Sequence, residues 1–185
     1  MDRWTRLWVF ARRRDPWKPL SSAKPRRKTN RSCGKCCITP CSFRKAKNRS
    51  TVRFCKDPAV SKYIEGWGRT GDIGYIALIR DVPVGSATAR FFSRKNPGYG
   101  FIDESIPELG MAVLPEYRGR GIGTLLLRTL MQSLSDRGIG AVSLSVDVRN
   151  PAERLYEWFG FYEVGTTGRS MTMRADLTDE GANHE

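Results

Sequence analysis

Cysteine and histidine are missing from most of this 185-residue chain. None of the five cysteines lies beyond Cys55, and the single histidine is His184. An odd number of cysteines gathered in one segment argues against a disulfide framework. Arginines interrupt the first twenty residues, and no run approaches the roughly 20 apolar residues that cross a bilayer. The sequence therefore predicts a cytoplasmic protein with neither a secretory signal nor a membrane contact.

Acidic residues are almost absent from residues 1–56, which hold 18 Lys and Arg against Asp2 and Asp15, a net charge of +16. Residues 57–185 hold 14 basic against 17 acidic residues, a net charge of −3. The first segment shows neither helical nor strand periodicity, and its composition predicts disorder. We therefore expect a basic, Cys-containing extension at 1–56, a folded domain at 57–178 and a tail at 179–185.

The folded domain alternates strand and helix patterns. Two strands around a connection at Asp81–Pro83, a loop and a short strand predict an antiparallel meander, and strand–helix–strand–helix–strand follows. The expected elements are a helix at 58–65, strands at 73–80, 84–93 and 109–113, a helix at 121–137, a strand at 141–148, a helix at 151–159, and one or two strands in 161–177. This order predicts an α/β fold with a mixed, mostly antiparallel sheet and flanking helices.

A glycine-rich turn opens the long helix that follows the third strand. Its glycines and arginines are Arg118, Gly119, Arg120, Gly121 and Gly123. Backbone N–H groups at such a helix start can hold a pyrophosphate, and the arginines add positive charge. Taken alone, the glycine pattern also fits a capped loop with surface arginines. No Lys-Ser/Thr pair follows the glycines, which excludes a P-loop, and no acidic residue stands where a dinucleotide fold would need it.

A second block, Asn150-Pro-Ala-Glu-Arg-Leu-Tyr156-Glu-Trp-Phe-Gly160-Phe161, lies one strand further on. With both blocks, the chain from residue 57 resembles the GNAT-type N-acetyltransferase family. Arg118-x-x-Gly121-x-Gly123 matches the family's acyl-CoA signature, Gln/Arg-x-x-Gly-x-Gly/Ala, and the second block matches its other conserved run. The resemblance implies an acyl-CoA N-acyltransferase-like fold over about 120 residues and does not extend to residues 1–56.

The resemblance implies acetyl-CoA as the acyl donor, an unidentified amine as the acceptor, and no metal ion. The pantetheine arm would contact the strand residues Met111, Ala112 and Val113, and also Asn150. The pyrophosphate would lie on the turn residues Arg118, Gly119, Arg120, Gly121, Ile122, Gly123 and Thr124.

Two residues take catalytic roles by the same resemblance. Tyr156 would be the general acid that protonates the departing thiolate, which suits a phenol with a pKa near 10. Glu108 would be the general base for the acceptor ammonium, with Asp103 and Glu104 attracting that cation. The structural alternatives are a tyrosine that packs in the core and a solvated carboxylate at a strand edge.

The basic extension leaves several interpretations open. Cys33-x-x-Cys36-Cys37-x-x-x-Cys41 could bind zinc, although no second ligand pair follows, and the arginines could contact nucleic acid non-specifically. Codons for Ser32–Lys56 read in the neighbouring frame can spell a peptide that resembles the family's first helix. This suggests a frame-shifted remnant and a catalytically impaired acyl-CoA binder. The oligomeric state stays open, with a homodimer among the alternatives.

Overall fold

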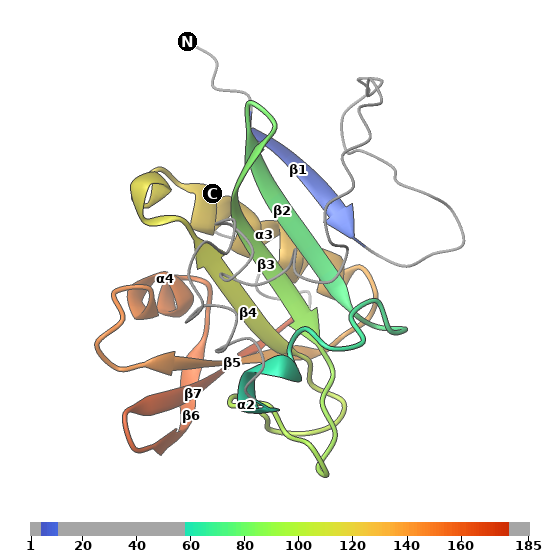
Figure 1. Ribbon diagram of the computed structural model, residues 1–185. Coiled ribbons are helices and arrows are strands. Elements are labelled where there is room, and N and C mark those ends of the chain that lie inside the picture. The colour runs from blue at the N-terminus through green and yellow to red at the C-terminus, as the bar shows by residue number, and fades with distance from the viewer. Residues whose placement is uncertain (1–4, 11–57, 178–185) are drawn as a thin grey trace. The chain divides into compact units, whose positions relative to one another are not determined.

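The structure, a computed structural model, describes residues 5–10 and 58–177 (Figure 1). The chain forms two compact units. The first combines the described residues up to Thr88 with Met111–Leu126, and the second combines Ala89–Gly110 with the described residues from Leu127 onward.

The first unit is built on consecutive strands of one sheet, in the order β1 (Thr5–Phe10), β2 (Ile73–Ile79), β3 (Val82–Arg90) and β4 (Glu108–Val113). β1 and β2 are antiparallel, from Thr5 opposite Ile79 to Phe10 opposite Gly74. β3 contributes its residues up to Thr88, and β4 contributes its last three residues.

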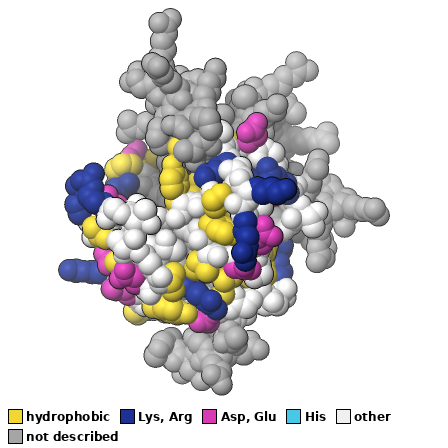
Figure 2. All heavy atoms as spheres, turned by 90° about the horizontal axis from the view of Figure 1, so that it is seen from below, with side chains coloured by type: hydrophobic (Ala, Val, Ile, Leu, Met, Phe, Trp, Pro, Cys, Tyr) yellow, Lys and Arg dark blue, Asp and Glu magenta, His cyan; other side chains and the backbone are white. Residues whose placement is uncertain are grey.

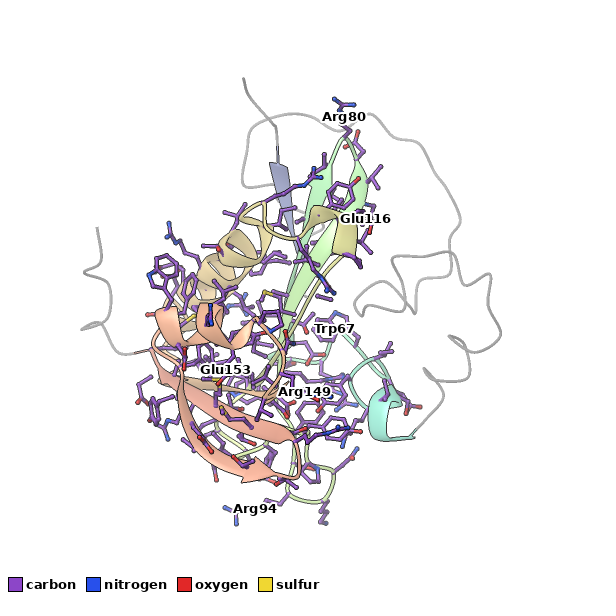
Figure 3. All side chains as sticks on the ribbon, turned by 90° about the vertical axis from the view of Figure 1, so that its left-hand side faces the viewer. Trp67, Arg80, Arg94, Glu116, Arg149 and Glu153 are labelled. Atoms are coloured by element: carbon purple, nitrogen blue, oxygen red, sulfur yellow. The ribbon has the colours of Figure 1, made fainter. Side chains whose placement is uncertain are left out.

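A two-residue turn joins β2 to β3. Arg80 and Asp81 both have positive φ angles, 51° and 64°, as tight hairpin turns of type I′ require. Arg80 stands at the tip of this hairpin (Figure 3). The predicted connection at Asp81–Pro83 was therefore too long, because Val82 and Pro83 already belong to β3.

β1 corrects the prediction for the N-terminal extension. Thr5–Phe10 reads Thr-Arg-Leu-Trp-Val-Phe, and its β-branched and aromatic residues favour a strand. The expectation that residues 1–56 are irregular throughout is therefore wrong at these six positions. The five cysteines, with the candidate zinc ligands and the segment of the frame-shift hypothesis, lie outside the described residues, as does His184.

Three helical segments in the described residues lie before residue 136. α2 (Pro58–Ser61) is shorter than the predicted helix at 58–65. Residues 62–66 form turns instead, and the last of them, Gly66, has a φ of 62°. The 3₁₀ turn η2 (Pro115–Tyr117) carries Glu116 and leads into α3 (Ile122–Ser135) (Figure 3). α3 confirms the predicted long helix, with its ends moved inward by one or two residues.

The second unit holds the start of β4, followed in the sheet by β5 (Ala141–Asp147), β7 (Ser170–Asp176) and β6 (Tyr162–Thr167). β4 and β5 run parallel where Glu108 lies opposite Ser143, whereas β5–β7 and β6–β7 are antiparallel. The short helix α4 (Glu153–Trp158) precedes β6. The predicted fold class, α/β with a mixed, mostly antiparallel sheet, is confirmed.

Leucines at helical spacing place α3 in the core. Its residues with no exposed surface are Leu126, Leu127, Leu130 and Leu134. Their burial removes apolar surface from water, which is the main source of stability for such a helix. On the face drawn in Figure 2, basic and acidic side chains lie among one another. None of the helices in residues 58–177 is long and apolar enough to cross a membrane.

Candidate functional site

The turn before α3 has the geometry of an anion-binding turn. Gly119 and Gly121 have φ angles of 67° and 77°, in the left-handed region that favours glycine. A Cβ atom at either position would meet no heavy atom within 4 Å, so the turn is open on that side. The bond from Leu125 N–H to the Gly121 carbonyl, 3.0 Å long, is the first i to i−4 bond of this helix. The N–H groups of residues 122–124 precede it and have no acceptor within the helix.

The two arginines of the turn make contacts within the first unit. Arg118 donates its backbone N–H to the Pro115 carbonyl (3.2 Å) and its Nε to the Val113 carbonyl (3.1 Å). The guanidinium of Arg120 lies 5.4 Å from the ring centre of Tyr117. The backbone N–H of Arg118, which was predicted to hold the pyrophosphate, thus already has an acceptor within the turn. The prediction is left with the backbone N–H groups of residues 119–124.

β4 holds the three residues predicted to contact the pantetheine arm, and all three are half-buried. Gly85 on β3 lies beneath the start of α3: a Cβ there would come within 3.1 Å of both the Ala112 carbonyl oxygen and Leu126 Cδ1. The missing side chain lets the helix approach the strands closely. This packing fixes the turn relative to the end of β4.

Tyr156 lies on α4 in the second unit and is 7% exposed. Its ring packs edge-on against Phe161, with ring centres 5.7 Å apart. Burial raises the pKa of Tyr156 to about 12, because the phenolate would lose its hydration. The phenol therefore carries its proton throughout the neutral range, as a general acid must.

The turn between β5 and α4 positions Asn150. Its Oδ1 accepts the backbone N–H of Ala152 at 3.0 Å, and its carbonyl accepts that of Glu153. The expected helix at 151–159 would make Asn150 its N-cap, but α4 begins only at Glu153, and Asn150 forms an Asx turn ahead of it. Arg149 lies on the same turn (Figure 3). Its Nε and Nη2 atoms donate hydrogen bonds to the Asp147 carboxylate, both at 3.0 Å.

Glu108 is buried, with 6% of its surface exposed, so the alternative of a solvated edge carboxylate is wrong. Gly98 of the loop between β3 and β4 lies directly against its carboxylate. Ser143 lies opposite it on β5 and is fully buried. Arg90, at the end of β3, is also buried.

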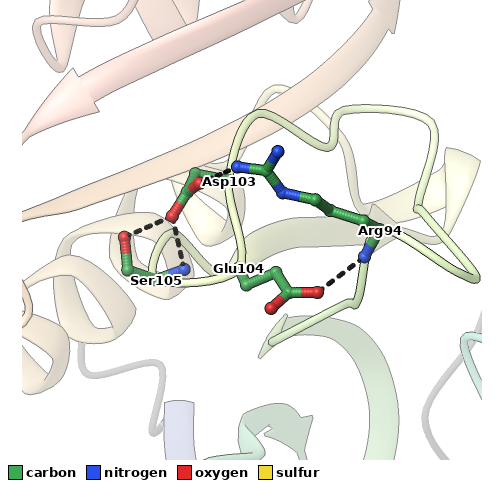
Figure 4. A network of polar contacts seen from close by, with 4 residues as sticks. All are labelled: Arg94, Asp103, Glu104 and Ser105. Carbon is green, nitrogen blue, oxygen red and sulfur yellow. Dashed lines mark hydrogen bonds and ion pairs between the residues drawn. The ribbon is translucent and has the colours of Figure 1, made fainter.

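Asp103 and Glu104 hold the same loop together (Figure 4). Asp103 pairs with the Arg94 guanidinium at 3.2 Å and accepts the N–H and hydroxyl of Ser105. Hydrogen bonds from Ser105, and then Arg94, lower the pKa of Asp103. Glu104 accepts the backbone N–H of Arg94 at 2.8 Å. Both carboxylates therefore stabilise the loop by hydrogen bonds and an ion pair. The prediction that they attract a cation did not include this structural role.

Sequence reasoning missed the surroundings of Glu108. Gly98 falls in the expected loop before the strand at 109–113, and Ser143 falls in the expected strand at 141–148, but the sequence gives neither residue a role beside Glu108. A glycine that follows proline in a long loop was the available signal for Gly98. Residues 58–177 bring no three His, Cys, Asp or Glu side chains together as a metal site.

The sheet, its flanking helices and the open turn at the start of α3 define the acyl-CoA N-acyltransferase class of folds. The model of the acetyltransferase (GNAT) family matches residues 42–161, more than half of the sequence, and the chain belongs to this family. The match begins fifteen residues before the predicted domain start at 57. The family resemblance therefore reaches further towards the N-terminus than the two motifs indicated.

Individual relatives match different lengths of the sequence. Ribosomal protein bS18-alanine N-acetyltransferase from Haemophilus influenzae is 44% identical over 54 residues, which are 29% of this chain and 37% of the relative. The chain thus matches little more than a third of that protein's length. Two solved structures share the fold, each with a TM-score of 0.51. Ribosomal-protein-alanine N-acetyltransferase from Brucella melitensis is 24% identical, with 63% of this chain and 75% of that chain covered. A GNAT-family acetyltransferase from Staphylococcus aureus is 18% identical, with 65% and 77% covered.

Proposed function

We propose that this protein transfers an acetyl group from acetyl-CoA to an amine. The observation that carries the proposal is the open turn before α3, where two glycines in left-handed conformations precede the N–H groups at the helix start. Such groups bind phosphate oxygens, and the helix dipole adds to the attraction. Both this turn and the family's acyl-CoA signature fit acetyl-CoA as the substrate.

The chemistry needs orientation and proton transfer. Glu108 takes a proton from the acceptor ammonium, directly or through one water, and the neutral amine attacks the thioester carbonyl. The carbon–sulfur bond then breaks, and the Tyr156 hydroxyl gives its proton to the departing thiolate. The attacking nitrogen, positively charged once its bond to the acetyl carbon has formed, loses a proton, and this proton restores the Tyr156 hydroxyl. Tyr156 holds its proton at neutral pH before the step, and its pKa of about 12 makes it a weaker proton donor than a free phenol. The products are the acetylated amine and free CoA.

The first acceptor to test is the amino group of an N-terminal alanine. The name of the Haemophilus influenzae relative gives an alanine of ribosomal protein bS18 as its acceptor. A peptide of about ten residues that begins with that amino acid is therefore a suitable probe, and its lysines can be acetylated beforehand so that one amine remains.

Calorimetry with CoA tests the binding step. We expect the wild type to bind CoA, and Gly121→Ala to bind it about 5- to 30-fold more weakly, because a left-handed alanine costs about 1–2 kcal/mol. Gly140→Ala is the matched control, since a Cβ there meets nothing within 4 Å and the backbone is not left-handed. Folded protein that releases no heat with CoA would refute the proposal.

Release of free thiol from acetyl-CoA tests the catalytic step. Tyr156→Phe should slow turnover about 10²- to 10³-fold and leave CoA affinity within about twofold. Tyr162→Phe, which removes an exposed hydroxyl that donates to Asp176, should change neither quantity. CoA binding without turnover of any amine would instead favour an impaired acyl-CoA binder. Retention on DNA that depends on residues 1–56 would favour the nucleic-acid alternative.

A further inference from the structure

The loop between β3 and β4 meets the rest of the second unit through two glycines. A Cβ on Gly98 would lie 1.9 Å from Glu108 Oε2 and 2.8 Å from its Cδ. One on Gly100 would lie 2.5 Å from the Leu144 carbonyl carbon and 2.7 Å from the Ser145 nitrogen. Carbon atoms pack no closer than about 3.5 Å, so a side chain at either position forces its neighbour to move.

The two glycines differ in what would have to move. The neighbour of Gly100 is the backbone of β5, which cannot shift without disturbing the sheet. The neighbour of Gly98 is the end of the Glu108 side chain, which can rotate away. A methyl group at position 98 therefore displaces a carboxylate, whereas one at position 100 strains the fold.

Further residues of the second unit lie near Gly98 and Glu108. Phe92, 8% exposed, has Cδ2 at 3.0 Å from the same Cβ position on Gly98. Ser143 lies opposite Glu108 on β5, with its buried Oγ making no hydrogen bond within the described part of the chain. Glu104 holds the start of the loop through the backbone N–H of Arg94. The loop is thus anchored while its glycine rests on the carboxylate.

We propose that Gly98 is a positioning residue: because it has no side chain, the loop rests on the Glu108 carboxylate and fixes the direction from which that group accepts a proton. The proposal rests on the proposed function, since the proton is the one that leaves the acceptor ammonium. It moves from the ammonium nitrogen to a carboxylate oxygen of Glu108. The nitrogen lone pair so released forms the bond to the acetyl carbon.

The test compares Gly98→Ala with the control Gly140→Ala. Both add one methyl group, but the second meets no atom within 4 Å. With acetyl-CoA and the alanine peptide, Gly98→Ala should lower kcat about tenfold, leave the KM for acetyl-CoA within about twofold, and change the acidic limb of the pH profile of kcat. Gly140→Ala should change none of these. An unchanged kcat and pH profile in Gly98→Ala would overturn the proposal.

A double-mutant cycle shows whether the effect passes through the carboxylate. Glu108→Asp shortens the side chain by one methylene and makes room for the methyl group. Added to Glu108→Asp, Gly98→Ala should cost less than about twofold in kcat, instead of about tenfold. Equal costs in both backgrounds would mean that Gly98 acts by another route, and the positioning role would be wrong.

The four proteins of this cycle are the wild type, Gly98→Ala, Glu108→Asp and the double variant. They also distinguish a failure of this proposal from a failure of the proposed function. If the wild type binds CoA but acetylates no amine, the catalytic part of both proposals fails. Melting temperatures then test the packing alone: Gly98→Ala should lower the melting temperature more in the wild type than in Glu108→Asp. Additive changes in melting temperature would show that the loop does not rest on the carboxylate.

Discussion

Burial of Tyr156 should make the protein lose stability in alkaline solution. Its pKa is about 12 in the folded protein, against about 10 for an exposed phenol, so only the unfolded chain ionises between these values. A raised pKa gives stability that is complete below pH 10 and disappears as the pH rises through 12. At about 1.4 kcal/mol for each pH unit, the loss reaches about 2 kcal/mol near pH 11.5. Tyr156→Phe removes the titrating group and should remove this loss.

Urea unfolding at about pH 8 and pH 11.5 measures the effect. The free energy of unfolding of the wild type should fall by about 2 kcal/mol more than that of Tyr156→Phe over this interval. Other tyrosines and lysines titrate in both proteins and cancel in the comparison. Tyr99→Phe, at a ring that is 60% exposed, serves as the control and should behave as the wild type. Parallel losses in wild type and Tyr156→Phe would mean that water reaches the hydroxyl, and the reasoning from burial would be refuted.

Three further substitutions test the frame around the site. Hydrogen bonds from the Arg149 side chain and then its backbone N–H lower the pKa of Asp147 to about 2, so Asp147→Asn should lower the melting temperature at about pH 6. That difference should shrink as the pH falls from about 4 to 2, and a difference independent of pH would contradict the ionic explanation. Leu130→Ala, at a side chain with no exposed surface, should lower the free energy of unfolding by about 2–5 kcal/mol in a denaturant titration, and a loss below about 1 kcal/mol would contradict its burial. Asn150→Ala should cost about 0.5–2 kcal/mol because Ala152 loses its acceptor, whereas Asn150→Asp keeps an acceptor and should cost less.

The parts of the fold that depend on residues close together in the sequence could be predicted. The leucine spacing and the glycine turn of α3 are local patterns, and the helix lies within two residues of its predicted ends. The start of the short helix α4 was predicted less accurately, because Asn150, three residues before the helix begins, accepts the backbone N–H of Ala152 in a separate turn. The β2–β3 turn was also misplaced, since the positive φ angles at Arg80 and Asp81 have no glycine to indicate them.

The surroundings of Glu108 could not be predicted, because they come from distant parts of the sequence. Gly98 lies ten positions before it and Ser143 thirty-five positions after it, and only the folded chain brings them together. A carboxylate in a strand of mixed polarity is more often exposed. Its burial follows from the path of the loop, which the loop composition does not determine.

The hydrogen bond that holds the start of this loop has a consequence for sequence variation at position 94. Glu104 accepts the main-chain N–H of Arg94, and every amino acid but proline can supply that donor. The guanidinium contributes an ion pair whose side chains are 76% and 42% exposed, and such surface pairs stabilise little. Homologous chains should therefore drift freely at position 94 among charged, polar and small residues while retaining an acceptor at 104. A proline at 94 would be the one substitution that calls for a compensating change elsewhere in the loop.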